Sequence, residues 1–102
     1  MKGKKDINEQ VEALQTQAKN VMSDTAVPVD KRIQRTADIY RQAENMADES
    51  GIDDKKYESL LSDSARFFYD YGMYKEALSR YTLLITLRET LYGQDHPMTA
   101  TA

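Results

Sequence analysis

Residues 61–81 read LSDSARFFYDYGMYKEALSRY, and residues 93–100 read GQDHPMTA. In the first stretch, Leu61, Ala65 and Phe68 are four and then three residues apart, so they share one face of a helix. The small side chain of Ala65 allows a second helix to approach closely, and Gly72 interrupts the helical pattern. The stretch therefore predicts a helix that packs against a neighbour and ends near Gly72.

The predicted third helix of the chain runs from about Lys55 to Tyr71, after a cap at Asp53 or Asp54. A fourth follows from about Tyr74 to Tyr92, and because the link is so short the two must lie antiparallel. We expect the third helix to bury Tyr57, Leu60, Leu61, Ala65 and Phe68. The fourth repeats the helical period at Tyr74, Ala77, Leu78, Tyr81, Leu84, Ile85, Arg88 and Leu91, which predicts an amphipathic helix.

These residues resemble the tetratricopeptide repeat (TPR) family. The positions that match its large, small and aromatic packing residues are Leu61, Ala65, Phe68, Gly72, Tyr74, Ala77 and Tyr81. The closing run resembles the Gly-x-Asp-His-Pro-x-Thr-Ala ending of the 42-residue repeats of kinesin light chains. The resemblance implies an all-α fold in which antiparallel helical hairpins stack as a short right-handed superhelix of about four helices. It places Phe68 and Tyr74 in the core. Two residues depart from the family pattern. The family commonly has a large apolar residue where this chain has Ser64, and a small residue where it has Leu84.

The first half of the chain predicts a second pair of helices, from about Asp6 to Met22 and from about Lys31 to Glu49. The residues expected to face inward are Ile7, Val11, Leu14, Ala18 and Val21, then Ile33, Ala37, Tyr40, Ala43 and Ala47. The spacing of the first set also fits a short coiled coil. Pro28 separates the helices, Asp30 is a candidate cap, and Gly51 ends the second helix with Ile52 packing after it.

Gly51 and Asp53 recur as Gly93 and Asp95, 42 residues later. This recurrence favours a degenerate repeat over a plain capping pair in the first half. We therefore expect one helical domain over residues 1–102. It would comprise a degenerate TPR-like pair at 6–50, a TPR hairpin at 54–93 and the start of an incomplete next repeat at 94–102.

The composition limits the classes of partner and compartment. The 102 residues carry a formal net charge of -3, which gives no general attraction to nucleic acids or anionic membranes. The basic Lys2, Lys4 and Lys5 are read as a solvated start of the chain. The sequence contains no cysteine and no apolar run long enough for a membrane span, so we expect a cytoplasmic protein without disulfides.

The sequence carries no recognisable catalytic or cofactor motif, so we expect a protein that is not an enzyme and binds no cofactor. His96 is the only histidine, and its neighbours Asp95 and Pro97 are typical of a helix start. An acidic group around Gly51 lacks the ligand spacing of a calcium loop and is read as helix capping; it comprises Asp48, Glu49, Asp53 and Asp54. We expect no metal site.

The aromatic residues near Gly72 include the candidate binding site. Phe67, Phe68 and Tyr69 point in directions about 100° apart, so one helix cannot bury them all. By the resemblance, a concave groove that holds a peptide or protein segment would be lined by Ser59, Ser62, Arg66, Tyr69 and Asp70. Tyrosine and arginine suit such a surface because they combine contact area with directional donors. The alternative is an exposed tyrosine that only covers the hairpin. Ser62 and Asp63 stand where kinesin light chain repeats commonly carry paired asparagines.

The sequence leaves two other interpretations open. The outer side of the fourth helix, including Leu84, Leu87 and Leu91, would lack its expected neighbour, so the chain could form a homodimer there. Alternatively, the sequence is an excerpt of a longer repeat array or the regulatory segment of a larger protein. The leading hypothesis is a scaffold for protein–protein interactions.

Overall fold

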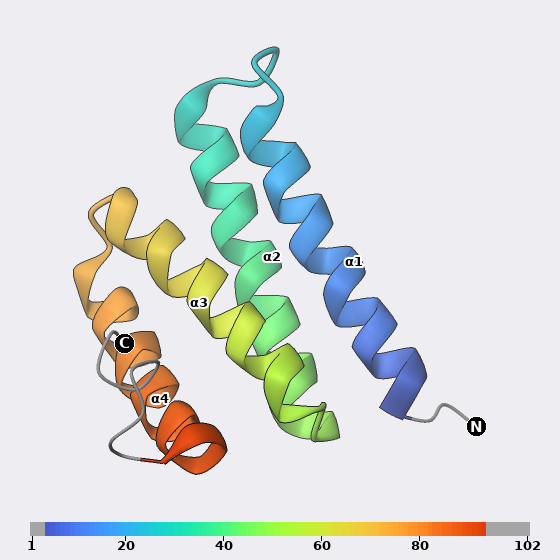
Figure 1. Cartoon of the computed structure of the whole chain (residues 1–102). Coiled ribbons are helices and arrows are strands. Elements are labelled where there is room, and N and C mark those ends of the chain that lie inside the picture. Colours follow the sequence, from blue (N-terminus) through green and yellow to red (C-terminus); the bar gives the residue numbers. More distant parts are fainter. Residues whose placement is uncertain (1–3, 94–102) are drawn as a thin grey trace. The chain divides into compact units, whose positions relative to one another are not determined.

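The computed structural model describes residues 4–93, and in this part of the chain it contains four α-helices (Figure 1). They are α1 (Lys4–Ser23), α2 (Val29–Ser50), α3 (Asp54–Asp70) and α4 (Tyr74–Tyr92). The chain divides into two compact units, Met1–Asp53 with α1 and α2 and Asp54–Ala102 with α3 and α4. Each unit holds one antiparallel hairpin. The predicted all-α class is confirmed, and each predicted helix end lies within two residues of the observed one. The repeat start expected at 94–102 lies outside the described residues.

In the first unit, small side chains let the two helices approach closely. Val11 and Ala18 of α1 are buried, as are Ala37, Tyr40, Ala43 and Ala47 of α2. Of the other residues expected to face inward, Ile7, Leu14, Val21 and Ile33 are only half-buried. The polar residues Gln15 and Thr36 are also buried, and the Thr36 hydroxyl donates to the Ala18 carbonyl at 3.5 Å. The burial of Gln15 and Thr36 cannot be predicted from apolar periodicity, because both side chains carry polar groups.

Arg32 fixes the connection between α1 and α2. Its Nε donates to the carbonyl of Val27 at 2.9 Å, and its Nη1 donates to the carbonyl of Met22 at 2.8 Å. The Met22 carbonyl belongs to the last turn of α1, where such acceptors lack an intrahelical partner. One partly buried guanidinium therefore ties the end of α1 to the loop that follows it.

The helix ends of this unit follow from single residues, with one correction. The α2 helix begins at Val29, with Pro28 at the cap position and no side-chain cap bond. The prediction that Asp30 caps α2 is wrong, because Asp30 lies within the first turn, where its charge favours the helix dipole. At the other end Gly51 has φ +64°, and the amide of the buried Ile52 donates to the Ala47 carbonyl at 3.4 Å. The predicted glycine stop is confirmed.

In the second unit, α3 ends in a Schellman motif at Gly72. The Met73 amide donates to the Phe68 carbonyl at 2.8 Å, and the Gly72 amide donates to the Tyr69 carbonyl at 3.2 Å. Gly72 has φ +80°, a conformation that residues with a Cβ rarely adopt. The buried residues of α3 are Leu60, Leu61, Ser64, Ala65, Phe67 and Phe68. The Ser64 hydroxyl is satisfied by the Leu61 carbonyl at 3.3 Å.

The orientation of α4 differs from the predicted one. Among its residues only Ala77 and Leu84 are fully buried. Tyr74, which was expected in the core, is 61% exposed, and Leu78 and Ile85 of the same helical period are 68% and 37% exposed. Leu84 was expected on the uncovered outer side and is buried, while Leu87 and Leu91 are half-buried. The helix is apolar on several sides, so its sequence pattern does not single out one buried face.

Candidate functional site

The five residues of the predicted groove lie together on the outward side of α3, which we call the α3 face. Ser59, Arg66, Tyr69 and Asp70 are exposed, and Ser62 is half-buried. Arg66 and Asp70 form an ion pair along the helix with Nε and Oδ2 3.8 Å apart. Both side chains are largely in solvent, so this pair contributes little to stability and leaves the guanidinium accessible.

Tyr69 forms an aromatic pair with Tyr74 of the next helix. The two ring centroids lie 5.5 Å apart in an edge-to-face arrangement, and both side chains remain exposed. The prediction that Tyr74 belongs to the core is therefore wrong. The signal for its true position is the short turn at Gly72, which brings the end of α3 next to the start of α4.

The core below this pair is anchored by Phe68. Its ring packs edge-on against Phe67, with centroids 5.3 Å apart, and Phe67 in turn lies 5.2 Å from the ring of Tyr71. The guanidinium carbon of Arg80 lies 4.4 Å from the centroid of Phe68, a cation–π contact between α4 and α3. These contacts fix the backbone that carries Tyr69 and Tyr74.

At the other end of the hairpin, Glu58 links α3 to α4 through both of its carboxylate oxygens. Oε2 accepts from Nε of Arg88 at 3.0 Å, and Oε1 accepts from the Tyr92 hydroxyl at 3.1 Å. Partial burial, together with the hydrogen bond to Glu58, raises the pKa of Tyr92 above its ordinary value. The cluster holds the helices together and presents no group to a ligand.

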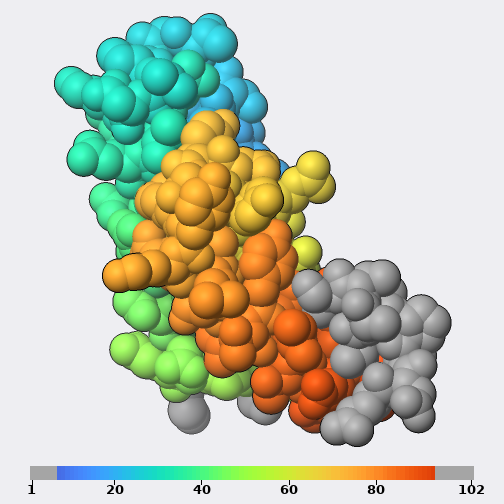
Figure 2. All heavy atoms as spheres, turned by 90° about the vertical axis from the view of Figure 1, so that its left-hand side faces the viewer, coloured from blue at the N-terminus to red at the C-terminus, as the bar shows by residue number. Residues whose placement is uncertain are grey.

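A line of apolar residues runs along the solvent side of α4. Tyr74, Leu78, Tyr81 and Ile85 alternate four and three residues apart, the spacing of a coiled-coil seam, and we call them the α4 stripe. Tyr81 is half-buried and the others are exposed. Figure 2 shows atoms of α4, in orange to red, at the surface that faces the viewer. The helical period of the sequence includes all four residues, but of these the resemblance placed only Tyr74 in the core.

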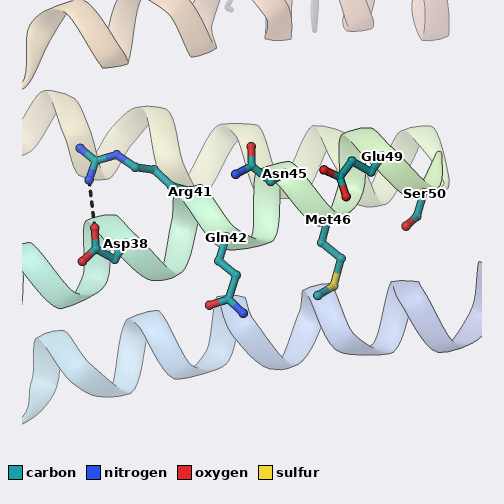
Figure 3. Close-up of a pocket in the computed structure, with 7 residues that line it drawn as sticks. All are labelled: Asp38, Arg41, Gln42, Asn45, Met46, Glu49 and Ser50. Carbon is teal, nitrogen blue, oxygen red and sulfur yellow. Dashed lines mark hydrogen bonds and ion pairs between the residues drawn. The ribbon is translucent and has the colours of Figure 1, made fainter.

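An open hollow of about 480 Å³ lies on α2 (Figure 3). Its lining consists of Asp38, Arg41, Gln42, Asn45, Met46, Glu49 and Ser50. In the close-up, Gln42 and Met46 point to one side of the helix, whereas Arg41 and Asn45 point to the other. Asp38 and Arg41 form an exposed ion pair at 3.2 Å. All of its lining residues except Met46 are polar or charged, and the hollow is open, so it lacks the convergent apolar walls of a small-molecule site.

The acidic group near Gly51 does not converge. Asp48, Glu49, Asp53 and Asp54 are all exposed, and within residues 4–93 no three His, Cys, Asp or Glu side chains are placed to hold a metal ion. His96 lies outside the described residues. In the part that is described, no helix has the length and apolar character needed to cross a membrane.

Comparison with family models, with curated proteins and with solved structures gave no match to this chain. The candidate sites therefore rest on the geometry of the α3 face and the α4 stripe.

Proposed function

We propose that this chain is a non-enzymatic module for protein–protein interactions, in which the α3 face binds a peptide or protein segment. The observation that carries the proposal is the exposed Tyr69–Tyr74 pair beside Arg66. Exposed tyrosines that are held by a rigid turn offer contact area at a low entropic cost, and an accessible guanidinium adds directional donors.

The architecture that we propose for this module is a short TPR-like array in which the two hairpins stack as a right-handed superhelix. Its support is local: Leu61, Ala65, Phe68 and Ala77 are buried at positions matched by the resemblance. Glycines 42 residues apart, Gly51 and Gly93, directly follow α2 and α4. The exposed Tyr74 departs from the expected packing. A regulatory segment of a larger cytoplasmic protein is a compatible setting.

The proposal is tested by substitution on the α3 face. A peptide selected from a random library on the intact chain serves as the probe, and its affinity is measured by fluorescence anisotropy. We expect Arg66→Ala and Tyr69→Ala each to weaken binding by about 10-fold, the loss typical of a central anchor. Arg35→Ala, at an exposed arginine of α2 outside the face, is the matched control for Arg66→Ala and should bind normally.

Helicity measured by circular dichroism should be the same in all three variants. If neither Arg66→Ala nor Tyr69→Ala changes the affinity of any selected peptide, the α3 face is not the binding surface.

A further inference from the structure

The α4 stripe is a continuous apolar seam along one helix. Tyr74, Leu78, Tyr81 and Ile85 follow the four-three spacing over three turns of α4. Isolated exposed apolar residues are ordinary, but a row at this spacing has the form of a helix–helix contact. Leu83 is also 50% exposed, yet it lies on the opposite side of α4 and outside this row.

The polar side chains beside the stripe do not oppose its burial. Thr82 and Thr86 are exposed, and their hydroxyls donate to the carbonyls of Leu78 and Thr82 at 2.9 and 3.2 Å. Each hydroxyl therefore already has an acceptor within its own helix, so a second helix could cover it without leaving an unsatisfied donor. The threonine methyl groups widen the apolar surface.

The charges that flank the stripe indicate what covers it. Lys75, Thr82 and Glu89 are seven residues apart, so they occupy the same side of the seam, and all three are exposed. If two copies of α4 pair antiparallel about the middle of the helix, Lys75 of each copy lies opposite Glu89 of the other. A parallel pair would instead keep each Lys75 about 21 Å along the axis from Glu89 of the other copy, so the opposite charges would not meet.

We propose that α4 pairs with α4 of a second copy of this chain, antiparallel, through the α4 stripe. In this register Tyr81 of one copy packs against Ile85 of the other, and the whole of α4 overlaps its partner. The inference goes beyond segment binding at the α3 face. Tyr74 belongs to the α4 stripe and also contacts Tyr69 of the α3 face, so the substitutions that test pairing leave it unchanged.

The apolar part of the proposal is tested with the intact chain by sedimentation equilibrium. We expect a monomer–dimer equilibrium in the unmodified chain. Leu78→Glu should raise the dissociation constant by at least about 100-fold, because each dimer loses two buried leucines and gains two buried charges. Leu83→Glu introduces the same charge on the opposite side of α4 and should leave the constant unchanged.

The orientation is tested by reversing charges. Lys75→Glu and Glu89→Lys should each weaken the dimer several-fold at low salt, and the double variant should restore it. Within one helix these residues are about 21 Å apart, too far for direct pairing, so rescue reports a contact between copies.

Three results would overturn the inference. The first is a chain that stays monomeric near millimolar concentration. The second is equal disruption by Leu78→Glu and Leu83→Glu. The third is a double charge reversal that fails to restore the dimer, which would rule out the antiparallel register. Circular dichroism confirms that each variant remains helical.

Discussion

At the level of single residues, the ion pair between Arg88 and Glu58 is distinguished by its burial. The side chains are 13% and 14% exposed, whereas those of the Arg41–Asp38 pair are 43% and 77% exposed. The Glu58 carboxylate also accepts the Tyr92 hydroxyl, so it is satisfied on both oxygens. Removing Arg88 would leave a mostly buried carboxylate without its counter-charge.

We therefore predict that Arg88→Gln lowers the free energy of unfolding by roughly 2–4 kcal/mol, because it breaks an ion pair that is mostly buried. Arg41→Gln, the same substitution at the exposed pair, should cost less than about 1 kcal/mol. Urea denaturation followed by circular dichroism measures both. Equal losses in the two variants would mean that the Glu58 cluster is not the tie between α3 and α4 that its geometry implies.

At the level of helices, Gly72 determines where α3 ends. Its φ of +80° completes the Schellman bonds of Met73 and Gly72, and a Cβ at this position would meet no atom within 4 Å. The cost of a substitution therefore comes from the backbone conformation alone and not from a steric clash.

We predict that Gly72→Ala destabilises the chain by about 1–2 kcal/mol, the penalty for a left-handed residue with a Cβ. Gly72→Asn should cost clearly less, because asparagine tolerates this conformation better. Thermal or urea unfolding of the three proteins gives the ranking. An alanine variant as stable as the asparagine variant would show that the turn relaxes to another conformation.

Helix ends could be predicted from the sequence because they depend on one residue each. Pro28, Gly51, Gly72 and Gly93 act through fixed backbone preferences, which do not depend on distant parts of the chain. The rotation of α4 could not be predicted, because Leu78, Leu83, Leu84 and Leu87 point in several directions and periodicity alone does not choose among them.

The five residues of the α3 face share one side of the helix, which follows from helical spacing alone. The function of this face stays a prediction. What the sequence did not indicate is that Tyr74 joins Tyr69, because the resemblance assigned Tyr74 to the core. This pairing depends on the three-dimensional course of the turn at Gly72.

At the level of the whole molecule, the chain consists of two compact units of about 50 residues each. Units of this size lie near the lower limit for folding alone when disulfides are absent, and the sequence has no cysteine. The expectation of a single domain over residues 1–102 stays a prediction.

We predict that residues 1–53 and residues 54–102, produced separately, are each less helical than in the intact chain and melt over a broad temperature range. Circular dichroism of each fragment, and of an equimolar mixture, measures this. A fragment with full helicity and a sharp transition would be an autonomous domain, and the single-domain expectation would then be wrong.

Arg32 acts as a clamp between the end of α1 and the loop that follows, and this clamp constrains how the loop can change over evolution. Both of its hydrogen bonds end on backbone carbonyls, those of Met22 and Val27, so the clamp does not depend on which side chains occupy the loop. Substitutions between these two positions leave both acceptors of Arg32 in place, whereas insertions would move them. Lysine could not replace Arg32, because its single ammonium does not reproduce the fixed fork of two donors.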